Sequence, residues 1–344
     1  MITIRTYLYP LFLACLLLCA GEIIARHRGF EPFRALEADR HEKSVVLPDT
    51  ALGWISKPGK YLFPRYEADG KMVEYNILTD GSRRTSQNQI PSNYDVILLG
   101  DSFTQGWAVS DEETFAWKLQ ALLPDYKIGN FGVGGYSAYQ VLLMMRKLSA
   151  DGVKAPVIIY GFNVFHEYRN IAPAAWLRTL AALTRRGYPS LPSCSLDRDE
   201  NIVEHKPAHW PVFPLQKYTA LPQMMIEIYY KFTTRQFERE LDARKINKKL
   251  LLGMDRFAKN NGVQFIPAIL NGTDEERKDY ADFFKQNGIK FFDISVELDD
   301  HNVIPVDGHP NVIVHTYWAE QLSKQLKLFL KSSASLNVSK VLEK

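Results

Sequence analysis

The most constraining feature of the sequence is a short apolar run that stops at a glycine and two polar residues. Residues 96–99 read Val-Ile-Leu-Leu, and Gly100, Asp101 and Ser102 follow them. A continuous apolar run of this length is typical of a strand that is buried on both faces of a sheet. Ser102 would then lie at the carboxyl end of a central strand, which is where open α/β sheets bind their ligands.

Four later segments repeat the apolar pattern. They are the runs at 126–128, 157–163, 263–270 and 290–294, and segments with helical periodicity separate them. Strands that alternate with helices indicate a mostly parallel sheet with helices on both of its faces. We therefore expect a doubly wound α/β domain with a five-stranded sheet.

Two helix starts are marked by a capping box, in which Ser or Thr is followed at the third position by Glu. Ser110 with Glu113 precedes an apolar stretch after the first strand, and Thr273 with Glu276 follows the fourth strand. The paired side chains satisfy backbone N–H groups that a helix N-terminus leaves free. We expect helices to begin at both places.

Length and charge narrow the classes of function. The 344 residues are 46% hydrophobic and 24% charged, which suits one α/β domain with additions better than two independent domains. The formal net charge is only +3, and no basic stripe is interleaved with aromatic residues. A nucleic-acid-binding surface normally shows such features, so we expect no nucleic-acid partner.

The N-terminus differs in composition from the rest of the chain. Residues 7–24 carry a single charge, at Glu22, and they are flanked by Arg5 and by the basic group at 26–28. Such a run is close to the roughly 20 residues that a membrane-spanning helix needs. We expect residues 1–28 to form a retained signal anchor or transmembrane segment, with a cleaved signal peptide and a buried helix as alternatives.

Two arguments about the orientation of this anchor oppose each other. More Lys and Arg residues lie on the C-terminal side of the apolar run than on its N-terminal side. The positive-inside rule would therefore keep the domain in the cytoplasm. The layout of a signal sequence argues for export instead.

Several segments depart from the alternation of strands and helices. Residues 29–93 are rich in Gly, Pro and Tyr, which predicts a lead-in with short strands. Residues 171–222 contain seven prolines, and we interpret this irregular insertion as a cap over the site. The charged segment 224–259 predicts one long helix, and the tail 331–344 is expected to be loose.

Residues suited to catalysis gather in four segments that we interpret as strand ends. The segments are Gly100 to Ser102, Gly132 to Gly135, Gly161 to Asn163, and Asp307 to His309. In a doubly wound sheet they converge on one edge. Hydrolysis by serine needs a base, a group that orients the base, and preorganised donors where the oxyanion develops. The chain offers a candidate for each role.

With these segments in this order, the chain resembles the SGNH (GDSL-type) hydrolase superfamily, and within it the membrane-anchored bacterial members. The resemblance covers residues 94–330 and implies the flavodoxin-like fold of that superfamily. It also implies that Ser102 is the nucleophile, that His309 is the base and that Asp307 orients His309. The exported habit of similar proteins favours a periplasmic or extracellular domain.

The same resemblance implies an oxyanion hole, and two positions differ from the family pattern. The implied donors are the backbone N–H groups of Ser102 and Gly135 and the side-chain amide of Asn163. Val164 stands where the third sequence block of the family commonly has aspartate. Gly308 alone separates the Asp–His pair, where many members have one residue more.

Other familiar patterns are absent or carry no chemistry. No G-x-S-x-G motif occurs, which excludes the nucleophile elbow of an α/β-hydrolase, and the glycines at 132–135 lack the spacing of a dinucleotide-binding turn. His205 and His209 have no carboxylates at ligand spacing, so we expect no metal site and no cofactor. Residues 165–169 follow the strand that ends at Asn163 and are candidates to line the pocket, but we favour a solvated helix start. His315 is interpreted as a structural residue.

The leading hypothesis is a serine esterase that removes acyl groups, acetyl above all, from an acylated carbohydrate or another small ester of the cell envelope. An alternative enzyme is an O-acyltransferase that passes the acyl group to a hydroxyl of an envelope or exported glycan. A third hypothesis is a membrane-tethered glycan-binding or assembly protein whose triad has lapsed. Intact Ser102, Asn163 and His309 argue against the third hypothesis, whereas Val164 keeps it open.

Overall fold

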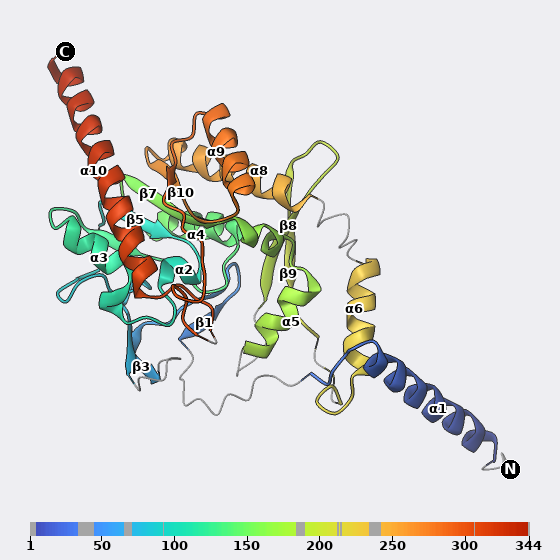
Figure 1. The fold of residues 1–344 in the computed structure, drawn as a ribbon. Helices are drawn as coiled ribbons and strands as arrows, with labels where there is room; N and C mark the ends of the chain where they lie inside the picture. The colour runs from blue at the N-terminus through green and yellow to red at the C-terminus, as the bar shows by residue number, and fades with distance from the viewer. Residues whose placement is uncertain are drawn as a thin grey trace.

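A parallel sheet of five strands organises the structure (Figure 1). This computed structural model describes residues 5–33, 45–64, 71–91, 93–183, 190–211, 213, 215–233, 242–305 and 307–342. The sheet contains β5 (Val96–Leu99), β6 (Ile128–Asn130), β7 (Val157–Asn163), β10 (Gln264–Asn271) and β11 (Phe292–Asp293). Its order is β11-β10-β7-β5-β6 with every pairing parallel, which is the flavodoxin-like arrangement. The doubly wound α/β fold predicted from the sequence is confirmed.

Alternate side chains of β5 enter two separate hydrophobic layers. Ile97 and Leu99 belong to the core that includes α4, α8 and α9, whereas Val96 and Leu98 belong to the core that includes α3 and α10 (Figure 1). Successive residues of a strand face opposite sides of the sheet, so a strand covered on both sides needs an uninterrupted apolar run. The helices are α3 (Phe115–Leu122), α4 (Ala138–Ala150), α8 (Ala243–Asn260), α9 (Asp274–Gln286) and α10 (Val312–Leu342).

Both predicted capping boxes are present. Thr273 and Glu276 open α9, as expected. Ser110 and Glu113 open the short 3₁₀ helix η1 (Asp111–Glu113), and α3 follows it. Local hydrogen bonding therefore determines where these helices begin.

Two antiparallel hairpins precede the sheet. β1 (Val46–Asp49) pairs with β2 (Gly53–Ser56), and β3 (Gly59–Pro64) pairs with β4 (Met72–Ile77). Trp54 of β2 is buried in the same core as α4 and α8. The lead-in contains the short strands that its composition predicts, and it packs directly against the parallel-sheet domain.

The proline-rich insertion is more regular than predicted. It contains α5 (Ala174–Leu183) and an antiparallel hairpin of β8 (Leu191–Leu196) and β9 (Ile202–Ala208). The expectation of an irregular segment was wrong, because Pro192 and Pro207 lie in a two-stranded hairpin. In a two-stranded hairpin, one edge of each strand pairs with no other strand. A proline can face that edge, because its missing N–H group then costs no hydrogen bond between strands.

Two helical predictions also differ from the structure. The charged segment 224–259 contains α6 (Leu221–Thr233) and α8 rather than one described helix, and residues 234–241 lie outside the described residues. Helix α10 continues to Leu342, whereas a loose tail was expected from Lys331. The tail contains neither Gly nor Pro, so nothing in its sequence stops a helix that has already begun.

The apolar run near the N-terminus forms helix α1 (Arg5–His27). Within Leu8–His27 the most apolar window has a mean hydropathy of 2.1, and only 6% of it is buried. The helix is thus long and apolar enough to cross a membrane. It projects from the domain beside α6 (Figure 1).

Candidate active site

Ser102 lies at the start of a four-residue helix, α2 (Ser102–Gln105), directly after β5. Asp101 caps this helix, because its carboxylate accepts a hydrogen bond from the Phe103 N–H at 3.0 Å. The sequence predicted a helix only after residue 110. The additional short helix holds the Ser102 hydroxyl at the carboxyl edge of the sheet.

Thr104 packs between the ends of β5 and β7. A Cβ atom on Gly100 or on Gly161 would lie 2.1 Å from Thr104 Oγ1, so neither glycine tolerates a side chain without rearrangement. The two glycines are required by close packing at this point. The contact fixes the turn that carries Ser102 against the strand that carries Asn163.

Ser102, His309 and Asp307 form a continuous chain of polar contacts. Ser102 Oγ lies 2.8 Å from His309 Nε2, and His309 Nδ1 lies 2.6 Å from Asp307 Oδ1. The three residues predicted as a triad are therefore brought together in the predicted order. One imidazole nitrogen faces the hydroxyl, and the other faces a carboxylate, as proton transfer through histidine requires.

A tight turn lets Asp307 reach His309 across one residue. Gly308 has a φ angle of +78°, which residues with a Cβ rarely adopt. Its N–H donates to the Ile304 carbonyl at 2.9 Å, and the Ile304 N–H donates to the His309 carbonyl at 2.7 Å. The short spacing of the Asp–His pair is therefore compatible with their side-chain contact.

Both oxygens of Asp307 have donors. Oδ1 contacts the His309 ring, and Oδ2 accepts a hydrogen bond from Trp107 Nε1 at 3.4 Å. Burial raises the pKa of the Asp307 carboxyl, but His309 and, to a smaller extent, Trp107 lower this pKa by more, to below its ordinary value. Asp307 is therefore an anion at neutral pH.

Asn163, at the end of β7, lies next to the nucleophile turn. Its Nδ2 donates one hydrogen bond to Asp101 Oδ1 at 3.2 Å. A side-chain amide nitrogen carries two N–H groups, so the second is available to a bound oxyanion. Asp101 thus orients the amide that the sequence predicts as an oxyanion donor.

The glycine turn after β6 contains two neighbouring N–H groups, those of Gly134 and Gly135, and they differ in whether they already donate a hydrogen bond. The Gly134 N–H donates to Gln105 Oε1 at 3.0 Å. Within the described part of the chain, neither the Gly135 N–H nor the Ser102 N–H donates to another group. These two are the backbone donors that the sequence predicts for an oxyanion.

His166 and Arg169 pack behind the nucleophile turn, and the sequence analysis missed them. The interpretation of residues 165–169 as solvated was wrong for these two, because both side chains are buried in the 3₁₀ helix η2 (Val164–Ile171), whereas Phe165 and Tyr168 are exposed. His166 Nε2 lies 2.9 Å, and an Arg169 guanidinium nitrogen 3.5 Å, from Asp101 Oδ2. Residues three apart share one face of a 3₁₀ helix, and this spacing was the available signal.

The imidazole of His166 is neutral at pH 7. Burial lowers its pKa to about 4, although the nearby Asp101 carboxylate opposes this shift. Burial raises the pKa of Asp101, but His166, Arg169 and the Phe103 N–H together lower this pKa by more. Asp101 therefore remains an anion and can hold the Asn163 amide in place.

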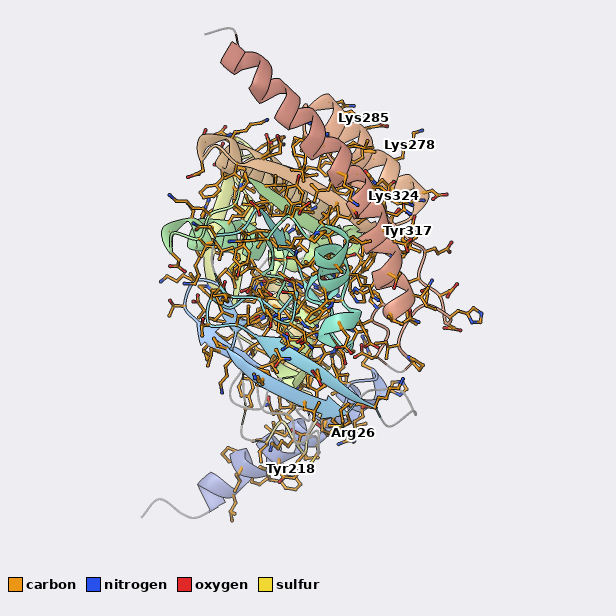
Figure 2. The ribbon with its side chains drawn as sticks, turned by 90° about the vertical axis from the view of Figure 1, so that its left-hand side faces the viewer. Arg26, Tyr218, Lys278, Lys285, Tyr317 and Lys324 are labelled. Carbon is orange, nitrogen blue, oxygen red and sulfur yellow. The ribbon has the colours of Figure 1, made fainter. Side chains whose placement is uncertain are left out.

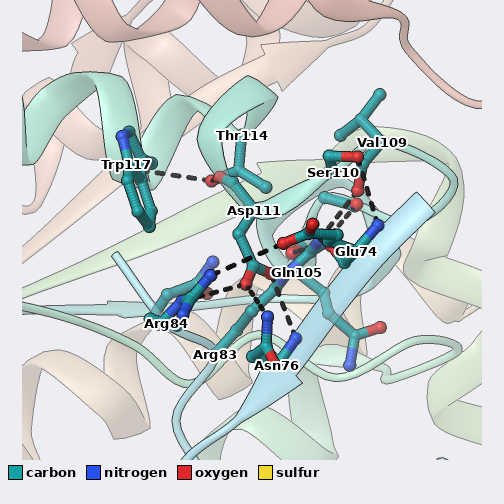
Figure 3. A network of polar contacts seen from close by, with 12 residues as sticks. Glu74, Asn76, Arg83, Arg84, Gln105, Val109, Ser110, Asp111, Thr114 and Trp117 are labelled. Atoms are coloured by element: carbon teal, nitrogen blue, oxygen red, sulfur yellow. Dashed lines mark hydrogen bonds and ion pairs between the residues drawn. The ribbon is translucent and has the colours of Figure 1, made fainter. Parts of the chain in front are cut away.

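A second buried network joins the lead-in to the loop after α2 (Figure 3). The Asp111 carboxylate lies 3.0 Å from Arg83 and 3.2 Å from Arg84, and it accepts a hydrogen bond from the Asn76 amide at 2.6 Å. Arg83 also donates to the carbonyls of Gln105 and Val109, at 2.9 and 2.7 Å. The lead-in therefore holds the loop between α2 and η1.

The insertion borders one side of the site. A Cβ atom on Gly135 would lie 3.5 Å from Trp176 and 3.5 Å from Leu180, both of α5. The Trp176 ring also packs against Arg169, whose Cζ lies 4.2 Å from the ring centroid. Coverage of Ser102 itself by the insertion stays a prediction.

The other histidines that the sequence analysis considered lie elsewhere. His315 Nδ1 accepts a hydrogen bond from the Phe115 N–H at 3.2 Å, and burial lowers the pKa of His315 to about 3. His205 lies in the insertion, where its Nε2 is 2.7 Å from Ser195 Oγ. Across the described ranges, no three His, Cys, Asp or Glu side chains are grouped as metal ligands would be.

Comparison with known proteins gives matches among solved structures only, since no family model and no curated protein matches the chain. A member of the lipolytic protein G-D-S-L family from Veillonella parvula is 12% identical with a TM-score of 0.37, and the match covers 66% of this chain and 94% of that one. TesA is 13% identical with a TM-score of 0.40, over 67% and 97%. A GDSL-like lipase from Bacteroides thetaiotaomicron is 11% identical with a TM-score of 0.36, over 67% and 87%. This chain is thus matched by structures of G-D-S-L lipolytic proteins over about two-thirds of its length.

Proposed function

We propose that this protein is an SGNH-type serine hydrolase that acts on ester bonds. The observation that carries the proposal is the contact chain from Ser102 through His309 to Asp307, at 2.8 and 2.6 Å. A serine nucleophile needs a base within hydrogen-bonding distance and an acceptor that orients this base. The chain supplies these groups in that order.

The proposed reaction uses only side chains and backbone groups of this chain. His309 Nε2 takes the hydroxyl proton while Ser102 Oγ attacks the ester carbonyl carbon, and Asp307 stabilises the imidazolium that forms. The N–H groups of Ser102 and Gly135 and the Asn163 amide stabilise the oxyanion. His309 then gives its proton to the leaving alcohol, which leaves the acyl group on Ser102. Water, deprotonated by the same imidazole, releases the acid.

The proposed substrate is an acyl ester, acetyl above all, on a carbohydrate or another molecule of the cell envelope. The Phe165 side chain is 43% exposed, and its ring centroid lies 5.9 Å from that of Phe103, the residue after Ser102. An exposed ring this close to the nucleophile offers an apolar contact to a small acyl group or to a sugar face. With α1 as a membrane anchor, the domain would be periplasmic or extracellular.

Acyl transfer to a glycan hydroxyl is the second candidate function. The observation that favours it is the packing of α5 residues Trp176 and Leu180 beside Gly135, and we propose that the insertion limits the access of water on that side. An acyl-enzyme shielded from water persists until another hydroxyl reaches it. The chemistry at Ser102 is otherwise the same.

The test uses the full-length protein in detergent with p-nitrophenyl acetate as substrate. We expect nitrophenol release that disappears in Ser102→Ala. The matched control is Ser195→Ala, which removes the other serine in contact with a histidine and should keep full activity. A folded wild-type protein that releases no nitrophenol would reject the hydrolase proposal. Adding an oligosaccharide acceptor, and measuring acetylated glycan against free acetate, separates transfer from hydrolysis.

A further inference from the structure

We propose that helix α6 and the loop before it rest on the lipid bilayer beside α1, and that they hold the domain against the membrane surface. The contact surface, which we call the α6 stripe, consists of Met225, Ile228, Tyr229 and Phe232. This inference rests on the membrane anchor that is part of the proposed function, and it is independent of the chemistry at Ser102.

The α6 stripe is an apolar face that points away from the protein. Its residues have helical spacing, and their exposed fractions are 60% for Met225, 47% for Ile228, 62% for Tyr229 and 81% for Phe232. Residues three and four apart lie on one face of a helix. On the other side of α6, Gln223 and Ile226 are buried. Contiguous exposed apolar residues of this kind mark a surface that contacts a partner or a membrane.

The start of α6 is tied to the end of α1. The Glu22 carboxylate of α1 accepts hydrogen bonds from the N–H groups of Ala220 and Leu221, at 2.8 and 2.9 Å. Gly21 packs so closely on Leu221 that an added Cβ would lie 3.1 Å from its side chain. Two N–H groups at the beginning of α6 are thus bound by the helix that would cross the membrane.

The loop before α6 adds exposed apolar residues at the same end of the molecule. Leu215 is 64% exposed and Tyr218 is 72% exposed. The Tyr218 carbonyl accepts a hydrogen bond from Arg26 of α1 at 3.4 Å, and Figure 2 shows both residues where α1 leaves the domain. Exposed apolar residues are therefore present on α1, in this loop and on α6.

The composition of this surface favours lipid over a protein partner. Aromatic residues such as Tyr218 and Tyr229 are enriched where a protein meets the headgroup region of a bilayer. Arg26, Arg28 and Lys231 are exposed on the same elements, and anionic lipid headgroups attract such cations. An apolar helical face with basic residues beside it, continuous with a membrane span, is the pattern of an interfacial helix.

The experiment places a fluorophore on the stripe in the full-length protein. Cys15, Cys19 and Cys194 are replaced by Ala, and Ile228→Cys is labelled with an environment-sensitive nitrobenzoxadiazole dye. The matched control is Lys285→Cys on α9, a side chain that is 67% exposed at the opposite end of the molecule (Figure 2). Both proteins are reconstituted into vesicles of phosphatidylcholine and phosphatidylglycerol, with and without brominated acyl chains.

We expect brominated lipid to quench the label at position 228 and to leave the label at 285 unchanged. Equal emission at 228 in brominated and ordinary lipid would overturn the proposal. If such a label were also shielded from aqueous iodide, a second copy or another protein would be the occupant. Phe232→Cys repeats the measurement one turn further along α6 should Ile228→Cys fail to fold. Turnover of p-nitrophenyl acetate by the unlabelled protein tests the esterase separately, because that substrate is soluble.

Discussion

Trp107 links the lead-in to Asp307. Its Nε1 lies 3.4 Å from Asp307 Oδ2, and its ring stacks on Phe63 of β3 with a centroid distance of 5.6 Å. Arg83 holds the loop that carries this tryptophan through hydrogen bonds to loop carbonyls. The Asp–His pair is therefore supported from outside the parallel-sheet domain.

Trp107→Phe tests this support, because it keeps a ring for stacking and removes the N–H donor. We expect kcat to fall about fivefold, the equivalent of one hydrogen bond of about 1 kcal/mol. The pKa of the Asp307 carboxyl should also rise, because Trp107 helps to lower it, and titration of that carboxyl by NMR measures the change. Phe63→Leu, which leaves the donor in place, is the control. An unchanged kcat and an unchanged pKa of Asp307 in Trp107→Phe would show that the contact has no functional role.

Asp307→Asn should leave the fold intact and cost on the order of 10⁴ in kcat, because the amide cannot hold the imidazole as the carboxylate does. Steady-state kinetics and circular dichroism check the two halves of this prediction. The informative alternative is a nearly unaffected Asp307→Asn protein beside an inactive His309→Ala protein. That pair of results would mean that another acceptor orients His309.

Asn163→Ala removes one of the proposed oxyanion donors. The amide acts on charge that develops only in the transition state, so we expect a loss on the order of 10²–10³ in kcat with little change in KM. Thermal unfolding of the variant is needed as a control, because Asn163 is buried and also contacts Asp101. A raised KM with unchanged kcat would place Asn163 in ground-state binding instead.

The buried His166 predicts how stability depends on pH. Its pKa is lowered from 6.5 to about 4 in the folded state, so the unfolded chain binds more protons between these two values. The contribution of neutral, buried His166 to the free energy of unfolding is fully present above pH 6.5. It falls by roughly 3 kcal/mol as the pH decreases towards 4. Urea unfolding at a series of pH values measures this loss.

His166→Gln is the variant that isolates this effect. Glutamine does not titrate, so the variant should lose less stability than the wild type between pH 6.5 and 4. His315, with a pKa of about 3, adds to the decrease in the free energy of unfolding with falling pH in both proteins. His301→Gln is the control, since His301 is exposed. Identical pH slopes in His166→Gln and the wild type would contradict a neutral, buried His166.

The sequence predicted the parts of the site that follow from local pattern. The strand before Ser102 is recognisable because burial on both faces requires an apolar run, and Asn163 ends a strand of the same kind. The order of short motifs located His309 and Asp307, although these residues lie far from Ser102 in the chain. The family resemblance, rather than the convergence of strand ends, placed them beside Ser102, because Asp307 and His309 precede α10 and do not directly follow a strand of the sheet.

The residues that the sequence did not predict act through long-range contacts. His166 and Arg169 look like solvated residues until Asp101 is placed beside them, since its carboxylate accepts from the imidazole and offsets the buried charge of Arg169. Arg83 likewise lies in a glycine-containing lead-in that predicts no chemistry. Its partner Asp111 sits 28 residues later, and nothing local indicates the pairing.

The network around Asp111 joins the lead-in to the folded domain. Replacing both Arg83 and Arg84 by uncharged residues would leave a fully buried carboxylate without a cation. Breaking a buried ion pair from one side typically costs about 3–5 kcal/mol, a large share of the stability of an ordinary domain. The lead-in is thus electrostatically part of the folded domain rather than a spacer between the membrane and the domain. Shortening it to bring the site nearer to the bilayer would also remove contacts that hold the loop after α2.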